Sequence, residues 1–443
     1  MIEIIPVGGY SEVGRNMTAI KVGNEMVILD MGLHLPNYIK VTEDEDIIHL
    51  SQEILRAADA IPDDSIIEPW KDMVKAIIPS HAHLDHVGAI PYIAKKYNCP
   101  ILCTRFTAEV IKTICRDEKI KLPNTIHALS ENATYTISDN IKIEFINVTH
   151  STPQTVIIAV HTPEGIIVYA NDFKFDNHPV LGKKPNYKRL EELGKENVVA
   201  LIVDSLYAYE DIKMPSESAV REMLKEVILD MPSKKKAIVI TTFSSHLARL
   251  KSIVDYSKKL KNRKIVFLGR SLAKYVLAGE KAGIVNFSKD VKIVKFSRQI
   301  RKELKHIEKA GAHRFVLVVT GHQGEPEATL SKMVNKILDF KFNKEDHVIF
   351  SCKTIPTEIN IKNRAQLERV LKNYGVSIFK DVHYSGHGGI EDIRELIDLV
   401  KPKHIIPTHA EPDKKKAALD LALELGYDQE DVHLIDDGQK LDL

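Results

Sequence analysis

The sequence predicts an α/β protein in which two β-sheets pack face to face with helices outside, joined to a region with a parallel sheet flanked by helices. Short apolar stretches with strand character recur toward both ends of the chain. Between about residues 208 and 362, strands alternate regularly with helical stretches. A histidine-rich loop, SHAHLDHVGA at 80–89, directly follows the apolar stretch MVKAIIP at 73–79, where a strand is expected to end.

Strand-like stretches dominate the first half of the chain. A polar, acidic stretch at 42–64 interrupts them and is expected to form a helix and a loop, and residues 88–97 have helical spacing. The expected strands are 2–9, 17–23, 25–32, 100–104, 142–148, 154–162, 165–172 and 198–205. Because these strands mix with exposed helices, we expect two packed sheets with helices on their outer faces.

The middle of the chain is predicted to form a separate domain at 208–362, inserted into a first domain made of 1–207 and 363–443. Its strands lie in KAIVITTFSSH, KIVFLGRSL, RFVLVVTGHQGEP and HVIFSCKTIP, and each ends in a turn rich in Gly, Ser or Thr. In a parallel sheet such turns gather at the carboxyl edge, where helix N-termini and hydroxyls hold phosphate. The residues expected to bind phosphate there are Ser244, Ser245, Arg270 and Ser271. No Walker motif and no G-x-G-x-x-G occurs, so a nucleotide cofactor is not expected.

Charge is distributed unevenly along the chain. The formal net charge of all 443 residues is +1. Residues 234–314 nevertheless contain 22 Lys or Arg and five Asp or Glu, so the remainder of the chain is acidic. Clustered basic charge in an otherwise acidic chain is typical of nucleic-acid binding, where phosphates supply most of the affinity.

The amino terminus and the cysteines indicate a cytoplasmic protein. MIEIIPVGGY runs into a strand without the basic and apolar segments of a signal peptide, and no apolar run approaches ~18 residues. Cys99, Cys103, Cys115 and Cys352 form no C-x-x-C pair, so neither a disulfide framework nor a zinc ribbon is expected.

The histidine-rich loop predicts a metal site. His81, His83, Asp85 and His86 lie within six positions, and crowding four such side chains is costly unless a cation binds them. Alternation in a tight turn sends His81 and His83 to one side and the other two to the opposite side. That arrangement suits two adjacent cations better than one closed tetrahedral site.

Further ligands are expected from strand ends elsewhere in the chain. His150 ends KIEFINVTH and Asp172 ends GIIVYAND, so both would reach the same edge as the histidine-rich loop. Near the carboxyl terminus, His383, His387 and His409 lie in loops marked by Gly or Pro, and His409 again follows a strand. A His or Asp at a strand end is more often a turn or cap residue, and only the neighbouring cluster favours the ligand interpretation.

The ordered set HAHLDH, His150, Asp172 and His409 resembles the metallo-β-lactamase fold, an αββα sandwich. The long insertion before the last histidine resembles the β-CASP branch of that fold, which processes nucleic acids. More narrowly, GGYSEVGRNM, TFSSH, GRSL, TGHQGEP and HYSGHGG are similar to ribonuclease J in its archaeal-type form. The resemblance spans nearly the whole chain. The chain ends soon after His409, and we expect it to lack the extra carboxyl-terminal domain of bacterial ribonuclease J.

The resemblance implies two zinc ions and the residues that bind them. His81, His83 and His150 would hold one ion, Asp85, His86 and His409 the other, and Asp172 would bridge them. Two such ions can activate a water for attack on phosphorus, so Asp85 is counted with the catalytic groups. A His/Asp site also accepts manganese.

The resemblance also assigns groups around the scissile phosphate. His383, Ser385 and His387 would contact that phosphate, and His387 would protonate the leaving 3′ oxygen. Asp204, in LIVDS, matches the first β-CASP motif and would orient His387 or a metal ligand. Asp30, in ILDMG, would support the metal loop.

The function implied by the resemblance is a zinc-dependent 5′→3′ exoribonuclease that acts on 5′-monophosphorylated RNA, with a homodimer as the family's assembly. Three alternatives stay open. One is an endonuclease similar to the cleavage-and-polyadenylation nuclease, the second is a small-molecule hydrolase of glyoxalase II type, and the third is a noncatalytic RNA-binding scaffold. The basic segment disfavours the small-molecule hydrolase, and the complete ligand set disfavours the scaffold. The sequence does not separate RNA from single-stranded DNA as substrate.

Other histidines are expected to have packing or surface roles, because no partner pattern surrounds them. They are His34, His127, His161, His246, His313 and His347. His322, in TGHQGEP, is the exception, because its loop is expected to face the phosphate-binding edge.

Overall fold

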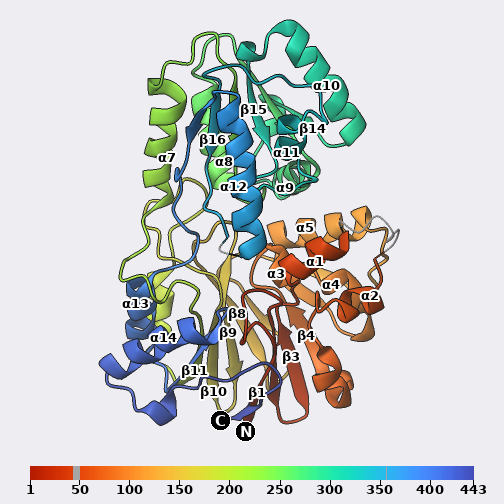
Figure 1. The fold of residues 1–443 in the computed structure, drawn as a ribbon. Coiled ribbons are helices and arrows are strands. Elements are labelled where there is room, and N and C mark those ends of the chain that lie inside the picture. Colours follow the sequence, from red (N-terminus) through yellow and green to blue (C-terminus); the bar gives the residue numbers. More distant parts are fainter. Residues whose placement is uncertain (43–49, 356) are drawn as a thin grey trace. The chain divides into compact units, whose positions relative to one another are not determined.

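The computed structural model describes residues 1–42, 50–355 and 357–443, which divide into two compact units (Figure 1). The first unit contains Met1–Asn177, Lys183–Met214 and Gly386–Leu443, and the second contains His178–Gly182 and Pro215–Ser385. Part of the acidic stretch at 42–64, residues 43–49, lies outside the described residues.

The first unit is built on two mixed sheets. The strands of one sheet are β1 (Ile2–Gly8), β2 (Met17–Val22), β3 (Glu25–Leu29), β4 (Val74–Ile78), β5 (Ile101–Thr104), β6 (Ile126–Leu129) and β19 (Leu441–Asp442). Those of the other are β7 (Thr134–Thr136), β8 (Lys142–Asn147), β9 (Val156–Thr162), β10 (Gly165–Ala170), β11 (Val198–Asp204) and β18 (His404–Thr408). Their orders are β19-β1-β2-β3-β4-β5-β6 and β18-β11-β10-β9-β8-β7, so both ends of the chain contribute strands.

An apolar core fills the space between these two sheets. Ile20 and Ile78 from one sheet and Ile158, Ile167 and Ile406 from the other are fully buried in a single cluster. Apolar alternation along the strands builds this layer, because successive side chains point to opposite faces. The predicted sheet-on-sheet packing is therefore confirmed.

Helices cover the outer faces of this sandwich. They are α1 (Leu35–Thr42), α2 (Gln52–Ala57), α3 (Leu84–Val87), α4 (Ile90–Ile93), α5 (Arg105–Asp117), α6 (Tyr187–Leu193), α13 (Ile390–Val400) and α14 (Pro412–Glu424), with 3₁₀ turns at Asp64–Met73, Ala94–Lys96 and Gln429–Asp431. A second cluster joins apolar residues of α6, α13 and α14 to the outer face of β10 and β11. The first unit is therefore an αββα sandwich, as predicted.

The second unit has one parallel sheet. Its strands are β12 (Ile238–Thr241), β13 (Lys264–Leu268), β14 (Val291–Val294), β15 (Phe315–Val319), β16 (His347–Phe350) and β17 (Ser377–Phe379), in the order β14-β13-β15-β12-β16-β17. Every neighbouring pair is parallel. Its helices are α7 (Glu217–Lys225), α8 (Leu247–Ser257), α9 (Arg270–Lys281), α10 (Ser297–Ala310), α11 (Thr329–Val334) and α12 (Glu358–Asn373), with short turns at Glu226–Asp230, Phe287–Lys289 and Ala312–Arg314. The predicted strand–helix alternation is confirmed.

The structure corrects the domain boundary expected after residue 362. That position falls inside α12, which packs its Leu367 and Leu371 into the core of the second unit. After α12 the chain adds β17 to the edge of the same sheet, beside β16. The second unit therefore continues to Ser385, and the first unit resumes at Gly386.

The sequence prediction also missed short edge strands. β14 and β17 have no more than four residues each and lie at the two edges of the parallel sheet. Partly exposed edge strands lack the continuous apolar run that identifies a buried parallel strand.

The described helices include none long and apolar enough to span a membrane.

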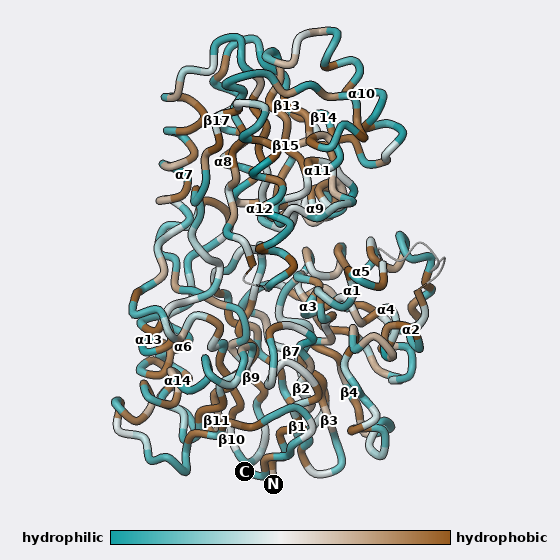
Figure 2. Tube along the Cα trace, in the orientation of Figure 1, coloured by the Kyte–Doolittle hydropathy of each residue, from teal (hydrophilic) through white to brown (hydrophobic). Residues whose placement is uncertain are grey.

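Hydropathy follows these layers along the chain. Figure 2 shows apolar colour along the strands of both units and hydrophilic colour along much of α10, whose sequence is SRQIRKELKHIEKA.

The four cysteines are free, as the sequence predicts, and all four are buried. Burial raises the pKa of Cys103 and of Cys352 to about 12, so these thiols are inert packing groups.

Candidate metal centre

The histidine-rich loop follows β4 and is held by the chain after β3. These strands are parallel, so the residues that follow them meet at one edge of the sheet. The carboxylate of Asp30 accepts hydrogen bonds from the backbone N–H and the hydroxyl of Ser80 at 2.7 and 3.0 Å. The chain then turns into α3, which carries Asp85 and His86. Gly32 lies so close that a Cβ there would be 1.6 Å from the carbonyl oxygen of Asp85.

The seven expected metal ligands lie together in the first unit, in two groups. One group is His81, His83, His150 and Asp172, and the other is Asp85, His86, Asp172 and His409. Within each group, all ligand atoms lie within 4.8 Å of one another. The fold thus gathers, at one edge, side chains that follow β4, β8, β10 and β18.

Asp172 stands between the two groups. Its Oδ2 is 3.4 Å from Nε2 of His81 and 3.4 Å from Nε2 of His150. Its Oδ1 is 3.3 Å from Nε2 of His86 and 3.7 Å from Nε2 of His409. This Oδ1 is buried and has no hydrogen-bond partner among the described residues. A buried carboxylate oxygen without a donor is costly, and a cation on each side of Asp172 would compensate it.

Polar groups orient four of the five histidine ligands from behind. Nδ1 of His81 lies 3.0 Å from the Ser80 hydroxyl, and Nδ1 of His86 lies 2.7 Å from Oδ2 of Asp30. Nδ1 of His150 lies 2.8 Å from the carbonyl oxygen of Gly386, and Nδ1 of His409 lies 2.9 Å from Oδ1 of Asn16. In each case the Nε2 atom is left to face Asp172. Such partners set the tautomer and orientation of metal-binding imidazoles.

His83 completes the first group with its Nδ1 atom. That nitrogen is 3.1 Å from Nε2 of His81 and 3.1 Å from Nε2 of His150. Burial lowers the pKa of His81, and it lowers the pKa of His83 and of His150 well below the usual value, so all three rings are neutral. Three neutral imidazoles that converge on one point are a donor set suited to zinc.

The second group has a negative environment. Burial raises the pKa of Asp172, but the charges of His409, His86 and His387 lower it well below its usual value. Burial lowers the pKa of His86, yet the surrounding carboxylates, Asp172 first among them, raise it well above its usual value. A field that favours a positive charge at this point also favours a bound cation. The donor set therefore fits divalent metal ions.

Several supporting residues escaped the sequence prediction. Tyr169 donates its hydroxyl hydrogen to Asp30 Oδ2 at 2.8 Å, and Asn171 donates to Asn16 Oδ1 at 3.0 Å. Asn16 also donates to the carbonyl oxygen of Asp85 at 3.0 Å. Asn16 belongs to the quoted GGYSEVGRNM motif, whereas nothing local distinguishes Tyr169 from a packing residue on β10.

His387 lies beside the two groups and is paired with Asp204. Its Nδ1 is 2.7 Å from Asp204 Oδ2, and its Nε2 is 3.7 Å from Asp172 Oδ2. Burial lowers the pKa of His387, but Asp172 and Asp204 raise it to about 9. The imidazole therefore holds a proton at neutral pH, with Nε2 directed toward the metal ligands.

The other expected phosphate contacts belong to the second unit. His383 and Ser385 are buried there, and His383 Nδ1 lies 3.3 Å from Nη1 of Arg249. Arg270 and Ser271 begin α9 and are exposed. Ser244 and Ser245 follow β12, so they share the carboxyl edge of the parallel sheet with the start of α9, as their sequence positions predict. Their contact with RNA stays a prediction.

A buried ion pair that the sequence did not reveal supports His383. Arg249 is fully buried and donates to both carboxylate oxygens of Glu217, at 2.6 and 2.8 Å. It also donates to the carbonyl oxygen of Ser351 at 2.9 Å. The same guanidinium therefore contacts Glu217 of α7, Ser351 after β16 and the carbonyl oxygen of Val382. These contacts hold the loop before His383 against the sheet.

The remaining histidines occupy separate places. His161 pairs with Glu144 at 2.9 Å, and Arg189 donates to the same carboxylate at 2.6 Å. His246 is buried, 3.3 Å from Glu217, and accepts a hydrogen bond from the first turn of α8. His322 packs edge-on against Phe243 with ring centroids 4.3 Å apart. Neither His322 nor any of the six histidines expected to have packing or surface roles belongs to a metal group among the described residues.

Three family models match the chain, and together they cover most of it. They are a beta-lactamase superfamily domain at residues 57–213, the beta-CASP domain of ribonuclease J at 235–372, and a Zn-dependent metallo-hydrolase RNA specificity domain at 377–434. A solved structure from Enterococcus faecalis V583, titled as a protein of unknown function, has the same fold with a TM-score of 0.65, 15% identity and 99% of both chains covered. The fold and the ligand groups define a metal-dependent hydrolase of the beta-lactamase superfamily.

Similarity to whole proteins narrows this class. The chain is 42% identical to ribonuclease J of Methanocaldococcus jannaschii, over 99% of this chain and 98% of that protein. It is 40% identical to ribonuclease J of Pyrococcus abyssi, over 96% and 94%. It is 29% identical to ribonuclease J 1 of Streptococcus pyogenes, of which it covers 74%. The chain belongs to the ribonuclease J family, which confirms the archaeal-type resemblance seen in the sequence.

Proposed function

We propose that this protein is a metal-dependent ribonuclease that hydrolyses phosphodiester bonds in RNA. The arrangement of two ligand groups that share Asp172, with the protonated His387 beside them, carries this proposal. Membership of the ribonuclease J family supports RNA as the substrate. The basic segment at 234–314 supports a polyanionic substrate independently.

The proposed cofactor is a pair of zinc ions, with manganese as the alternative metal. His81, His83 and His150 would hold one ion and Asp85, His86 and His409 the other, with Asp172 between them. Two such ions supply positive charge to the phosphate oxygens and lower the pKa of water for the attack on phosphorus. The imidazole-rich first group favours zinc, and the carboxylates of the second group are also compatible with manganese.

The chain's own groups would then complete the reaction. His387 would donate its proton to the leaving 3′ oxygen, and Asp204 would hold the ring in position for that transfer. His383 and Ser385 would bind nonbridging phosphate oxygens. Ser244, Ser245, Arg270 and Ser271 would bind a terminal phosphate at the carboxyl edge of the parallel sheet.

The proposed direction of degradation is 5′→3′, with preference for a 5′-monophosphate. Family likeness supports this polarity, and the hydroxyl and guanidinium groups that follow β12 and β13 support a terminal phosphate site. We further propose a cytoplasmic homodimer, supported by family likeness alone. Activity on single-stranded DNA is a subsidiary prediction of the same site.

The test uses single-stranded RNA labelled at its 3′ end and carrying either a 5′-monophosphate or a 5′-triphosphate. The zinc-loaded protein is compared with His81→Ala and with the matched control His127→Ala, which removes an exposed histidine on β6. We expect stepwise shortening from the 5′ end, faster on the monophosphate, unchanged in the control and lost in His81→Ala.

Other outcomes would select other functions. Internal fragments that ignore the 5′ group would replace the exonuclease with an endonuclease. Intact RNA under all conditions, together with failure to bind RNA at low salt, would point to a small-molecule hydrolase. Binding without any cleavage by the zinc-loaded protein would point to a scaffold.

A further inference from the structure

Two tyrosines extend from the metal centre toward solvent along the turn that follows β11. The ring of Tyr207 lies 6.0 Å from the ring of His387, centroid to centroid, at an interplanar angle of 49°. The ring of Tyr209 lies 6.0 Å from that of Tyr207, at 34°. Tyr209 is 55% exposed. The three rings therefore form a series that leads from the proton-holding histidine to the surface of the first unit.

The turn that carries these rings is tied to the same groups as the reaction centre. Asp204 holds His387 through Oδ2 and accepts a hydrogen bond from the backbone N–H of Leu206 at 2.9 Å through Oδ1. Glu210 donates its backbone N–H to the carbonyl oxygen of Tyr207 at 3.0 Å. The backbone N–H of Ile390, at the start of α13, donates to the carbonyl oxygen of Glu210 at 3.0 Å. Both rings are thus carried by a fixed turn.

Packing does not account for the position of Tyr209. The residue between the tyrosines, Ala208, is 2% exposed and belongs to the apolar cluster under α6, α13 and α14. In this turn Ala208 is buried, whereas Tyr207 is half-buried and Tyr209 is exposed. Lys414 of α14 lies with Nζ 6.0 Å from the Tyr209 ring, and its ammonium group pairs with Glu411 at 2.7 Å. A cation therefore accompanies the exposed ring.

A series of aromatic faces with an accompanying cation is the arrangement that binds single-stranded nucleic acid. Every base has a π-face, so stacking tolerates any sequence, and it contributes about 1–3 kcal/mol per base. A nuclease that shortens RNA of any sequence needs contacts of this kind beside the scissile phosphate. Tyr207 is adjacent to the residue that would protonate the leaving group, which places the series within reach of a neighbouring nucleotide.

We propose that Tyr207 and Tyr209 form a base-stacking subsite for the nucleotides next to the scissile phosphate of single-stranded RNA. This inference rests on the proposed ribonuclease function and adds the part of the substrate that these residues recognise. Tyr207 stacks on the nearer base and Tyr209 on the next one. Lys414 offsets the charge of the backbone between them.

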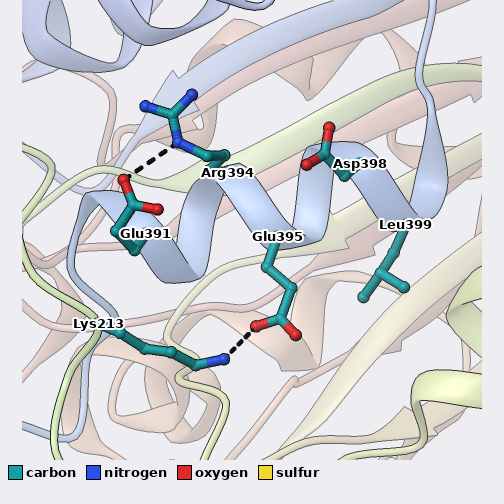
Figure 3. A pocket seen from close by; sticks show the side chains of 6 residues that line it. All are labelled: Lys213, Glu391, Arg394, Glu395, Asp398 and Leu399. Atoms are coloured by element: carbon teal, nitrogen blue, oxygen red, sulfur yellow. Dashed lines mark hydrogen bonds and ion pairs between the residues drawn. The ribbon is translucent and has the colours of Figure 1, made fainter.

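The hollow over α13 in the same unit is a less suitable surface for RNA (Figure 3). Three carboxylates line it, from Glu391, Glu395 and Asp398. Its two cations are already paired, Lys213 with Glu395 at 2.5 Å and Arg394 with Glu391 at 3.1 Å. Phosphates would meet net negative charge there, and no aromatic ring is among the residues that line it. The tyrosine turn offers two rings and Lys414, although Lys414 is also paired with a carboxylate.

The test measures binding and turnover separately. Single-stranded RNA carries 2-aminopurine at successive positions from the 5′ end, with phosphorothioate linkages to slow cleavage, and its fluorescence reports stacking. The zinc-loaded variants are Tyr207→Ala, Tyr209→Ala and each tyrosine to Phe. The control Tyr135→Ala changes a half-buried tyrosine on β7. Zinc content and thermal unfolding show whether each variant remains folded and loaded.

We expect each alanine variant to raise the dissociation constant roughly 5- to 150-fold and to raise KM more than it lowers kcat. The Phe variants and the Tyr135→Ala control should bind as the unmodified protein does. An abasic nucleotide next to the scissile phosphate should weaken binding to the unmodified protein and weaken it no further in the alanine variants.

Equal losses from the abasic nucleotide in the unmodified protein and the alanine variants would overturn the stacking subsite. So would a Phe variant as weak as its alanine counterpart. If RNA is cleaved as proposed while either result holds, only the subsite fails. If the unmodified protein neither binds nor cleaves RNA, the proposed function fails with it.

Discussion

Replacing Asp30 by Asn tests whether the metal centre depends on the carboxylate behind His86. Asp30 is fully buried, and its Oδ2 is 2.7 Å from Nδ1 of His86 and 2.8 Å from the Tyr169 hydroxyl. Its Oδ1 accepts from the Ser80 backbone N–H at 2.7 Å. The carboxylate therefore only accepts at these contacts, and Nδ1 of His86 must carry the hydrogen.

The amide can reproduce only part of this arrangement. If its oxygen keeps the Ser80 contact, its NH₂ group faces Nδ1 of His86 and forces that atom to accept. The ring hydrogen then moves to Nε2, the atom that faces Asp172 and would bind metal. Loss of such an orienting partner weakens metal binding about 10- to 100-fold, which corresponds to about 1.4–2.7 kcal/mol.

The assay is competition for zinc between the protein and a chromophoric chelator at pH 7.5. The matched control is Asp139→Asn, which removes one carboxylate charge from an exposed turn of the same unit. We expect the control to retain the zinc affinity of the unmodified protein and Asp30→Asn to lose one to two orders of magnitude. A folded Asp30→Asn protein with unchanged zinc affinity would refute the proposed role of the tautomer.

Three further perturbations follow from buried contacts. Glu217→Gln leaves the guanidinium of Arg249 buried beside a neutral partner, so chemical denaturation should show a free energy of unfolding lower by about 3–5 kcal/mol. An unchanged denaturation midpoint would contradict this prediction. Gly32→Ala places a Cβ 1.6 Å from the Asp85 carbonyl oxygen, and calorimetry and zinc analysis should show at least about 1–3 kcal/mol of destabilisation with loss of metal. Burial raises the pKa of Glu144, but its histidine and arginine partners lower it to about 2 from 4.5. Because the pKa of Glu144 is lower in the folded state than in the unfolded state, its contacts with His161 and Arg189 stabilise the protein above pH 4.5. This stabilisation is lost as the pH falls toward 2. The free energy of unfolding of Glu144→Gln, measured by urea denaturation, should therefore decrease less between pH 4.5 and pH 2 than that of the unmodified protein.

The histidine-rich loop was readable from sequence because its four ligand types lie within six positions. The predicted division of His81 and His83 from Asp85 and His86 matches the two groups of the structure, but its cause is the start of α3, which carries Asp85 and His86, and not strand alternation. The apolar stretches likewise predicted the paired sheets and the parallel sheet, since strand periodicity is a local property.

Contacts between distant segments were not readable in this way. Asn16 and His409 are 393 positions apart and meet because β1 and β18 bring the two ends of the chain into one sandwich. Arg249 looks like an ordinary helix residue until folding buries it against Glu217 and the loop before His383. The boundary at Gly386 also depends on an edge strand, β17, too short to be recognised.

By itself, the sequence determined the fold class, the ligand types and the family resemblance, because these depend on periodicity, residue chemistry and motif order. The resemblance already implied that Asp172 lies between the two groups, and only the tertiary structure decided that Asp30 orients His86 and that Tyr207 continues the line of rings from His387. Such relations depend on distances between side chains that are far apart in the chain, and these distances exist only once the sheets have packed.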